Sequence, residues 1–237
     1  MKYNISFLIL LSILIMTLPL RAQLEPGVYM AQETVDQGQR HYLLLVADGY
    51  MIHTVYDRDP DGFIDTKGGY YKVDGDSLSV ELEFNFSFET DREKTHRAQI
   101  TGKDGTLVFN GNQQRTYQRQ SAINQDLDGQ WLFASRGPDT GQERRGDHTP
   151  RKTLKFLQDG YFQWIAYHTE TMKFSGTGGG HYTADGGTYT EKIHFFSRDA
   201  SRVGAELQFQ YEVKGKDWHH QGKNSRGEPM YEIWGRR

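Results

Sequence analysis

The chain of 237 residues contains no cysteine, and its 31 acidic and 28 basic side chains give a formal net charge of −3. The lack of cysteine excludes disulfides, thiolate metal sites and a thiol nucleophile, and the mild acidity is unlike the basic footprint of a nucleic-acid binder. Stability must therefore come from packing, for which 13 Phe, 14 Tyr and 4 Trp supply large apolar areas.

The N-terminal segment, residues 1–22, predicts export. It contains Lys2, an almost wholly apolar run from Phe7 to Leu20, and Arg21-Ala22 before a polar Gln23. The run is shorter than the roughly 20 residues that span a bilayer, so we expect a signal peptide, with an uncleaved anchor as the alternative. The mature chain is then secreted or periplasmic and has no membrane span.

The remainder of the chain is an internal duplication. Asp48-Gly49-Tyr50 recurs as Asp159-Gly160-Tyr161, and the match continues without a gap to Phe84 and Phe195, with 12 identities in 37 positions. Self-similarity at a fixed offset is the signature of repeated structural units. We therefore predict a first domain at 23–120, which is the more divergent copy, a polar linker at 121–126 and a second domain at 127–237.

Each copy shows the pattern of eight β-strands separated by short turns. In the second copy we expect strands at 131–133, 154–157, 161–167, 174–182, 189–196, 205–213, 218–221 and 230–234. Eight antiparallel strands with one apolar face can close on themselves and so remove their exposed edges. The predicted fold is all-β, with two tandem eight-stranded antiparallel up-and-down barrels, and a single large sheet is the alternative.

Alternation along the strands predicts which side chains face inward. Leu78, Val80, Leu82 and Phe84 share one face, and Glu83 lies on the other. The aligned strand of the second copy places Tyr189, Glu191, Ile193 and Phe195 on the inward face. The glycine-rich run 176–180 lies within a strand and predicts sharp coiling or a bulge there.

The second copy resembles the lipocalin-like, calycin-type domains of secreted bacterial proteins. The motifs that carry the resemblance are Gly129-x-Trp131, Asp159-Gly160-Tyr161-Phe162-x-Trp164, Gly178-Gly179-Gly180-His181-Tyr182, Tyr189-Thr190-Glu191-Lys192 and Tyr231-Glu232-Ile233-Trp234-Gly235-Arg236. In the first copy, Tyr29 replaces the tryptophan and Val80 stands where Glu191 does. The resemblance implies a barrel that encloses a small, largely apolar molecule, with Arg236 packed across Trp131 to close one end.

We expect aromatic side chains and one acid of the second copy to contact this ligand. They are Phe162, Trp164, Tyr182, Tyr189, Glu191, Phe209 and Tyr211, and Leu154 is a further candidate for the cavity wall. The same side chains could instead fill the interior. An inward Glu191 must be paired or neutral, because burying a lone charge is costly. It would orient a ligand, act as an acid/base if the protein is an enzyme, or be satisfied structurally by an Arg or Tyr.

One acidic segment predicts a calcium site. Asp57, Asp59 and Asp61 occupy alternate positions, and Gly62 and Asp65 follow, as in the first part of a calcium loop. The expected glutamate at the twelfth position is absent, so an acidic, solvated hairpin tip is the alternative. No histidine pair has a spacing specific for zinc or iron, and no other cofactor is expected.

The polar segment from Ser135 to Pro150 is the longest predicted loop. Its Arg136, Arg144 and Arg145 could meet an anionic head group at the open end of the barrel, or the loop could be simply solvated. The favoured function is ligand binding within a barrel. A pocketless envelope or surface interaction module and an enzyme using Glu191 are the alternatives, and the oligomeric state stays open.

Overall fold

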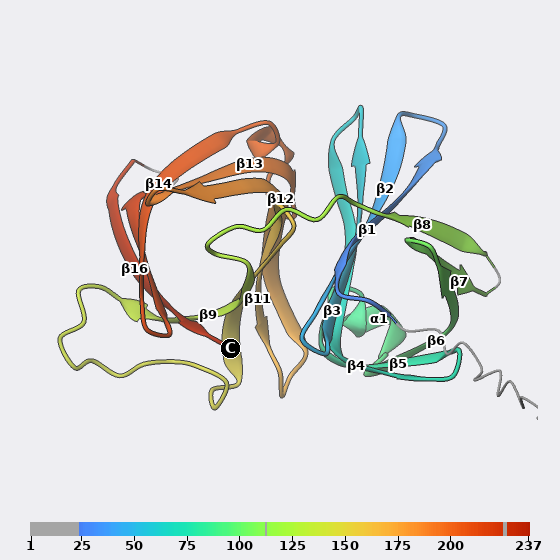
Figure 1. Cartoon of the computed structure of the whole chain (residues 1–237), viewed down its shortest axis with the longest axis horizontal. Coiled ribbons are helices and arrows are strands. Elements are labelled where there is room, and N and C mark those ends of the chain that lie inside the picture. Colours follow the sequence, from blue (N-terminus) through green and yellow to red (C-terminus); the bar gives the residue numbers. More distant parts are fainter. Residues whose placement is uncertain (1–23, 112, 225–226) are drawn as a thin grey trace, which may run out of the picture.

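The computed structural model describes residues 24–111, 113–224 and 227–237, so the predicted signal peptide at 1–22 lies outside the described residues. Two closed eight-stranded antiparallel barrels lie side by side (Figure 1), which confirms the predicted all-β tandem fold. Helices in the described part of the chain are too short and too polar to cross a membrane.

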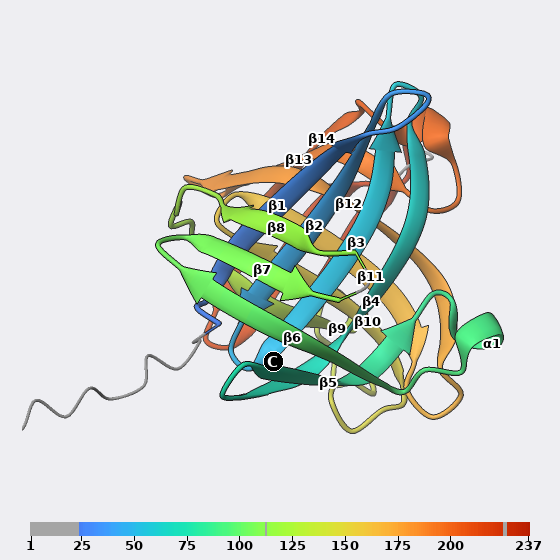
Figure 2. The ribbon, with the colours of Figure 1, turned by 90° about the vertical axis from the view of Figure 1, so that its right-hand side faces the viewer.

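Each barrel is a simple meander in which every strand pairs with the next and the last pairs with the first. Barrel 1 consists of β1 (Gly27–Thr34), β2 (Gln39–Ala47), β3 (Tyr50–Arg58), β4 (Gly62–Asp74), β5 (Ser77–Asn85), β6 (Thr95–Lys103), β7 (Thr106–Asn110) and β8 (Arg115–Arg119). Barrel 2 consists of β9 (Gly129–Arg136), β10 (Arg151–Gln158), β11 (Tyr161–His168), β12 (Lys173–Asp185), β13 (Thr188–Phe196), β14 (Glu206–Lys214), β15 (Asp217–Lys223) and β16 (Pro229–Arg236). A four-residue helix, α1 (Phe88–Asp91), lies at one lip of barrel 1 (Figure 2), and a 3₁₀ turn, η1 (Ala200–Arg202), follows β13.

The repeated Asp-Gly pairs build equivalent hairpins in the two barrels. Asp48 and Gly49 have φ angles of 51° and 72°, and Asp159 and Gly160 have 50° and 78°. Two consecutive left-handed residues form the type I′ turn, whose twist matches that of the flanking strands. The turn pairs the last residue of β2 with the first of β3, which fixes the register of both strands.

A β-bulge in β5 changes which side chains of this strand face the interior of barrel 1, so the predicted alternation is wrong beyond the bulge. Gly69 pairs with Leu82, whereas its neighbour Gly68 pairs with Phe84, so Glu83 is an extra residue on β5. The extra residue reverses the alternation beyond it. Leu82 therefore faces the interior as expected, but Phe84 points out of the barrel and Glu83 does not face solvent.

Barrel 2 repeats the bulge in β13. Gly180 pairs with Ile193 and Gly179 pairs with Phe195, which makes His194 the extra residue. Ile193 belongs to the interior of barrel 2, whereas Phe195 packs against barrel 1. The expectation that Phe195 faces inward is wrong for the same physical reason as for Phe84.

Glycine is required opposite each bulge because the strands approach closely there. A Cβ atom on Gly69 would lie 1.9 Å from the carbonyl oxygen of Glu81, and one on Gly180 would lie 2.0 Å from that of Lys192. No side chain fits at these distances. The glycine-rich run 176–180 thus marks a bulge, as the sequence predicted.

The two barrels share a third apolar core between their outer faces, formed chiefly by β2, β3, β10 and β11. Equivalent aromatic residues of the two copies cross it reciprocally, as in a twofold dimer. The crossing ring pairs are Tyr56–Phe195, Phe84–Tyr167 and Phe63–Phe174, with centroids 4.9, 5.1 and 6.2 Å apart. Leu154 and Phe156 also lie here, so Leu154 is not part of a cavity wall. The duplicated chain thus has the architecture of a fused dimer.

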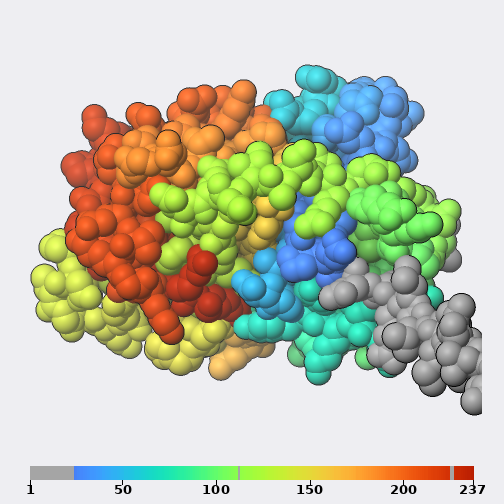
Figure 3. Space-filling view, viewed as in Figure 1, coloured from blue at the N-terminus to red at the C-terminus, as the bar shows by residue number. Residues whose placement is uncertain are grey.

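Polar side chains inside this contact are hydrogen bonded across it. The Gln163 side chain accepts a bond from Thr54 at 2.8 Å and donates to Thr66 and Thr177 at 3.1 and 3.0 Å. Thr66 and Thr177 are equivalent residues of the two copies, so Gln163 lies where the two halves meet. The linker crosses the same junction on the face shown in Figure 3.

Candidate functional site

The interior of barrel 2 holds a buried ion pair that begins on β10. Leu154 and Phe156 face barrel 1, so the residue between them, Lys155, points into barrel 2 with its side chain 7% exposed. Lys155 Nζ lies 2.7 Å from Glu191 Oε1. The hydroxyl of Tyr189 donates to the same oxygen at 2.8 Å. Glu191 therefore faces inward as expected and is satisfied by a lysine and a tyrosine.

Aromatic rings surround the Lys155 ammonium group. Its nitrogen lies 5.0 Å from the ring centroids of Tyr189 and Trp218, 5.3 Å from Trp234 and 6.0 Å from Phe209. Ring faces attract a cation most strongly where water is excluded. The cage and the carboxylate together offset the cost of placing a charge inside the barrel.

Barrel 1 has no such pair. In the strand register, Lys155 lies opposite Trp131 in barrel 2. At the equivalent place in barrel 1, Leu44 lies opposite Tyr29. Val80 stands at the position of Glu191. Because barrel 1 closes with two apolar residues at these positions, the fold does not require the ion pair. It is a feature of barrel 2 alone.

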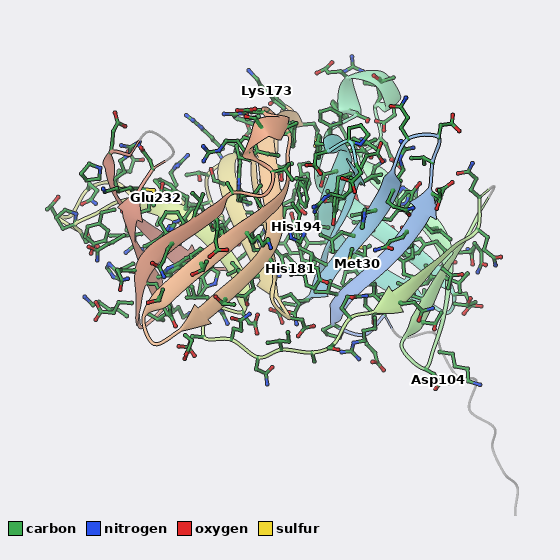
Figure 4. All side chains as sticks on the ribbon, turned by 90° about the horizontal axis from the view of Figure 1, so that it is seen from above. Met30, Asp104, Lys173, His181, His194 and Glu232 are labelled. Carbon is green, nitrogen blue, oxygen red and sulfur yellow. The ribbon has the colours of Figure 1, made fainter. Side chains whose placement is uncertain are left out.

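A cavity of about 260 Å³ lies above the ion pair, at the end of barrel 2 where β15 ends and β16 begins. Its walls include Lys155, Trp164, Glu191, Phe209, His220 and Glu232. Figure 4 shows Glu232 on the side of barrel 2 that is turned away from barrel 1. The structure thus brings three predicted ligand contacts, Trp164, Glu191 and Phe209, to one cavity, with Phe162 and Tyr189 in the packed core of the barrel.

His220 is the unsatisfied polar group of this cavity. It is 2% exposed, and neither ring nitrogen has a hydrogen-bond partner among the described residues. Its Nδ1 lies 3.6 Å from Glu232 Oε2, too far for a hydrogen bond. Burial, aided by the nearby Lys155 charge, lowers the pKa of His220 to about 4, so the ring is neutral at pH 7. A buried polar group without a partner is costly, and a ligand in the cavity can supply the missing bond.

The opposite end of barrel 2 is closed. The Arg236 guanidinium carbon lies 4.7 Å from the centroid of the Trp131 ring, and the indole nitrogen donates to the Leu127 carbonyl at 2.8 Å. Tyr182 and Tyr211, both predicted to touch a ligand, instead bond through their hydroxyls to Asp128 and Asp126 of the connecting segment. Their hydroxyls thus serve the closed end, and neither tyrosine lines the cavity.

The four aspartates of the predicted calcium loop do not converge. Asp57 forms a two-bond ion pair with Arg40, at 2.8 and 3.0 Å. Asp61 lies 2.9 Å from Arg58, Asp65 accepts a bond from Ser87 and Asp59 occupies the tip of the hairpin. In the described part of the chain no three acidic or histidine side chains are grouped as a metal ion requires. The geometry gives the calcium prediction no support.

Barrel 1 has a cavity of about 270 Å³ at its corresponding end. Its histidine, His53, is partly buried and bonds to the Tyr117 hydroxyl at 3.0 Å. The charged groups around the cavity are also paired: Lys67 and His96 both lie 2.8 Å from Glu93, and Arg115 lies 3.1 Å from Glu33. In contrast to His220 of barrel 2, the histidines and cations of this lining are already paired.

Two residues of the site were missed by the sequence argument. Lys155 lies in a run, 154–157, that is buried on both faces and therefore shows no alternation. The signal that could have revealed it is the paired change from Leu44 and Val80 to Lys155 and Glu191 between the aligned copies. The second residue is His220, which no spacing to another histidine singles out in the sequence.

Comparison of the chain with protein-family models, curated proteins and solved structures found no match. The class that the fold and the cavities define is a tandem β-barrel protein with a small cavity in each barrel.

Three partly or fully buried histidines predict a fall in stability at mildly acidic pH. Burial lowers the pKa values of His53, His194 and His220 to about 3, 4 and 4, so the unfolded chain binds protons first as the pH falls below 6.5. This contribution to stability is complete above pH 6.5 and is lost towards pH 4. For His220 it amounts to about 2 kcal/mol between pH 7 and pH 5.

Urea unfolding of wild type and His220→Asn at both pH values measures this effect. Between pH 7 and pH 5, the free energy of unfolding of the variant should fall by about 2 kcal/mol less than that of wild type. His148→Asn, which changes an exposed histidine, should behave as wild type. An unchanged pH dependence in His220→Asn would contradict the assignment.

Proposed function

We propose that the protein is a secreted or periplasmic, lipocalin-like binding protein whose barrel 2 takes up a small, largely apolar molecule through its open end. The observation that carries the proposal is the buried, unsatisfied His220 on the wall of a cavity that also presents apolar and aromatic side chains. Ligand sites are typically apolar concavities with a few polar groups that fix orientation. This cavity has that composition, with Trp164, Phe209 and Met230 on its walls.

The size of the cavity limits the ligand. Its volume of about 260 Å³ lies just below the roughly 300 Å³ at which ligand pockets begin, so one or two fused rings or a short chain would fill it. The free nitrogens of His220 favour a ligand that carries a hydrogen-bonding group at its inner end. The N-terminal apolar segment, Phe7 to Leu20, supports export.

The alternatives are less well supported. Cavities in both barrels argue against a pocketless interaction module. An acid/base role for Glu191 is disfavoured because one of its oxygens already accepts bonds from Lys155 and Tyr189. We therefore retain ligand binding as the function.

A cavity-filling substitution tests the proposal. Leu207 borders the cavity, and Leu207→Trp should lower the affinity for the neutral probe N-phenyl-1-naphthylamine at least about tenfold by occupying its space. Val213→Trp is the matched control, because Val213 lies on the same strand but is 43% exposed. Fluorescence titration measures both. Equal affinities of wild type and Leu207→Trp, or no binding to wild type, would overturn the proposal.

A further inference from the structure

An open groove adjoins the barrel 2 cavity. It has a volume of about 1,020 Å³ and is formed by the end of β9, the loop 137–150 and the start of β10. The loop lies at the outer edge of barrel 2 (Figure 3, yellow). Thr153, Glu232 and Trp234 line both spaces. The groove is therefore the outer continuation of the cavity, and a ligand can extend from one into the other.

Three arginines line this groove without ionic partners. The guanidinium groups of Arg136, Arg145 and Arg151 form no hydrogen bond or ion pair with any described residue, and Arg145 stacks on Phe133 at 4.3 Å. The adjacent Arg144, in contrast, forms a two-bond ion pair with Asp217 at 2.9 and 2.6 Å. Burial and the neighbouring Arg151 lower the pKa of Arg145, and the Glu232 carboxylate opposes them only in part. A negative charge placed there would relieve this repulsion.

The acids of the same surface offset these positive charges only in part. Glu143 is exposed on the loop, and Glu232 accepts a bond from the Trp234 indole nitrogen at 3.1 Å. Together the groove and the cavity are lined by five basic side chains, three arginines and two lysines, against three glutamates. This local excess of positive charge stands out on a chain whose net charge is −3.

We propose that the ligand of barrel 2 is a small amphipathic anion, whose apolar part fills the cavity and whose carboxylate, sulfonate or phosphate group binds Arg145 and Arg151 in the groove. Planar guanidinium groups suit such oxyanions because they can donate two parallel hydrogen bonds. This inference rests on the proposed function, since it assigns the polar end of the same ligand. Barrel 1 provides no equivalent, because the basic groups of its cavity are already paired.

Two probes with one aromatic skeleton test the inference. N-phenyl-1-naphthylamine is neutral, and 8-anilino-1-naphthalenesulfonate carries an added sulfonate. In Arg145→Gln/Arg151→Gln, we expect the affinity for the sulfonate to fall at least about tenfold and that for the neutral probe to change by less than about twofold. The control Arg97→Gln/Arg202→Gln, which removes two arginines away from the groove, should leave both affinities unchanged.

The outcomes separate this inference from the proposed function. If the groove variant weakens both probes equally, or neither, the anion subsite is wrong, while neutral-probe binding that Leu207→Trp abolishes would still stand. If wild type binds neither probe, the proposed function itself fails. Wild type should also not sediment with phosphatidylglycerol vesicles, and sedimentation lost in the groove variant would assign the arginines to a lipid surface and overturn the proposal.

Discussion

Replacing Lys155 by leucine will lower the free energy of unfolding by about 3–5 kcal/mol, because the buried Glu191 carboxylate loses its counter-ion. The double variant Lys155→Leu/Glu191→Val, which installs the apolar pair found in barrel 1, should return to within about 1 kcal/mol of wild type. Urea unfolding measures both. The double variant tests directly whether Lys155 and Glu191 stabilise each other. If they do, removing Glu191 as well should restore the stability that Lys155→Leu loses.

An exposed ion pair in the same barrel is the control. Lys214 and Glu212 lie 2.8 Å apart but are more than half exposed, so Lys214→Leu should change stability by less than about 1 kcal/mol. A double variant as unstable as Lys155→Leu alone would show that the two buried residues do not stabilise each other.

Removing Glu83, which lies in the contact between the barrels, will lower the free energy of unfolding by a similar amount. Its carboxylate is 13% exposed and accepts bonds from Tyr50, Tyr167, Lys152 and Arg237, at 2.9, 2.7, 3.3 and 2.8 Å. Glu83→Ala removes the carboxylate that both buried hydroxyls donate to, and it leaves the two nearly buried cations with Asp147 as their remaining carboxylate. We expect a loss of about 3–5 kcal/mol.

The matched control for Glu83 is two positions away on β5. Glu81 is exposed and accepts a single bond from Thr95, so Glu81→Ala should change the free energy of unfolding by less than about 0.5 kcal/mol. Equal effects of the two substitutions in urea unfolding would contradict the role of Glu83 as the polar centre of the inter-barrel contact.

Periodicity and turn chemistry were enough to predict the strands. All eight expected strands of the second copy correspond to β9–β16, because the Asp-Gly turns and the alternation are local signals. Barrel closure followed from the number of strands and their single apolar face. These features depend on neighbours in sequence, and a single sequence contains them.

The facing of the side chains was predicted less well because a third core lies between the barrels. Runs such as 43–46 and 154–157 are buried on both faces, so alternation could not show which residue points inward. The bulges at Glu83 and His194 reversed the expected facing beyond them. Both effects depend on tertiary contacts that alternation within one strand does not report.

The candidate site was predicted in part. Trp164, Glu191 and Phe209 were expected at the ligand and border the cavity, whereas Tyr182 and Tyr211 serve the closed end. An inward strand position does not specify its depth along the barrel, and depth decides whether a side chain meets the cavity or the closing segment. Lys155 was hidden by the two-sided burial of its strand.

The most direct test of the account is the position of a bound probe. A crystal structure of the complex with 8-anilino-1-naphthalenesulfonate should show the rings in the barrel 2 cavity beside Trp164 and His220, with the sulfonate against Arg145 and Arg151. Density for the probe in barrel 1, or only on the outer surface, would contradict the claim that barrel 2 is the binding site.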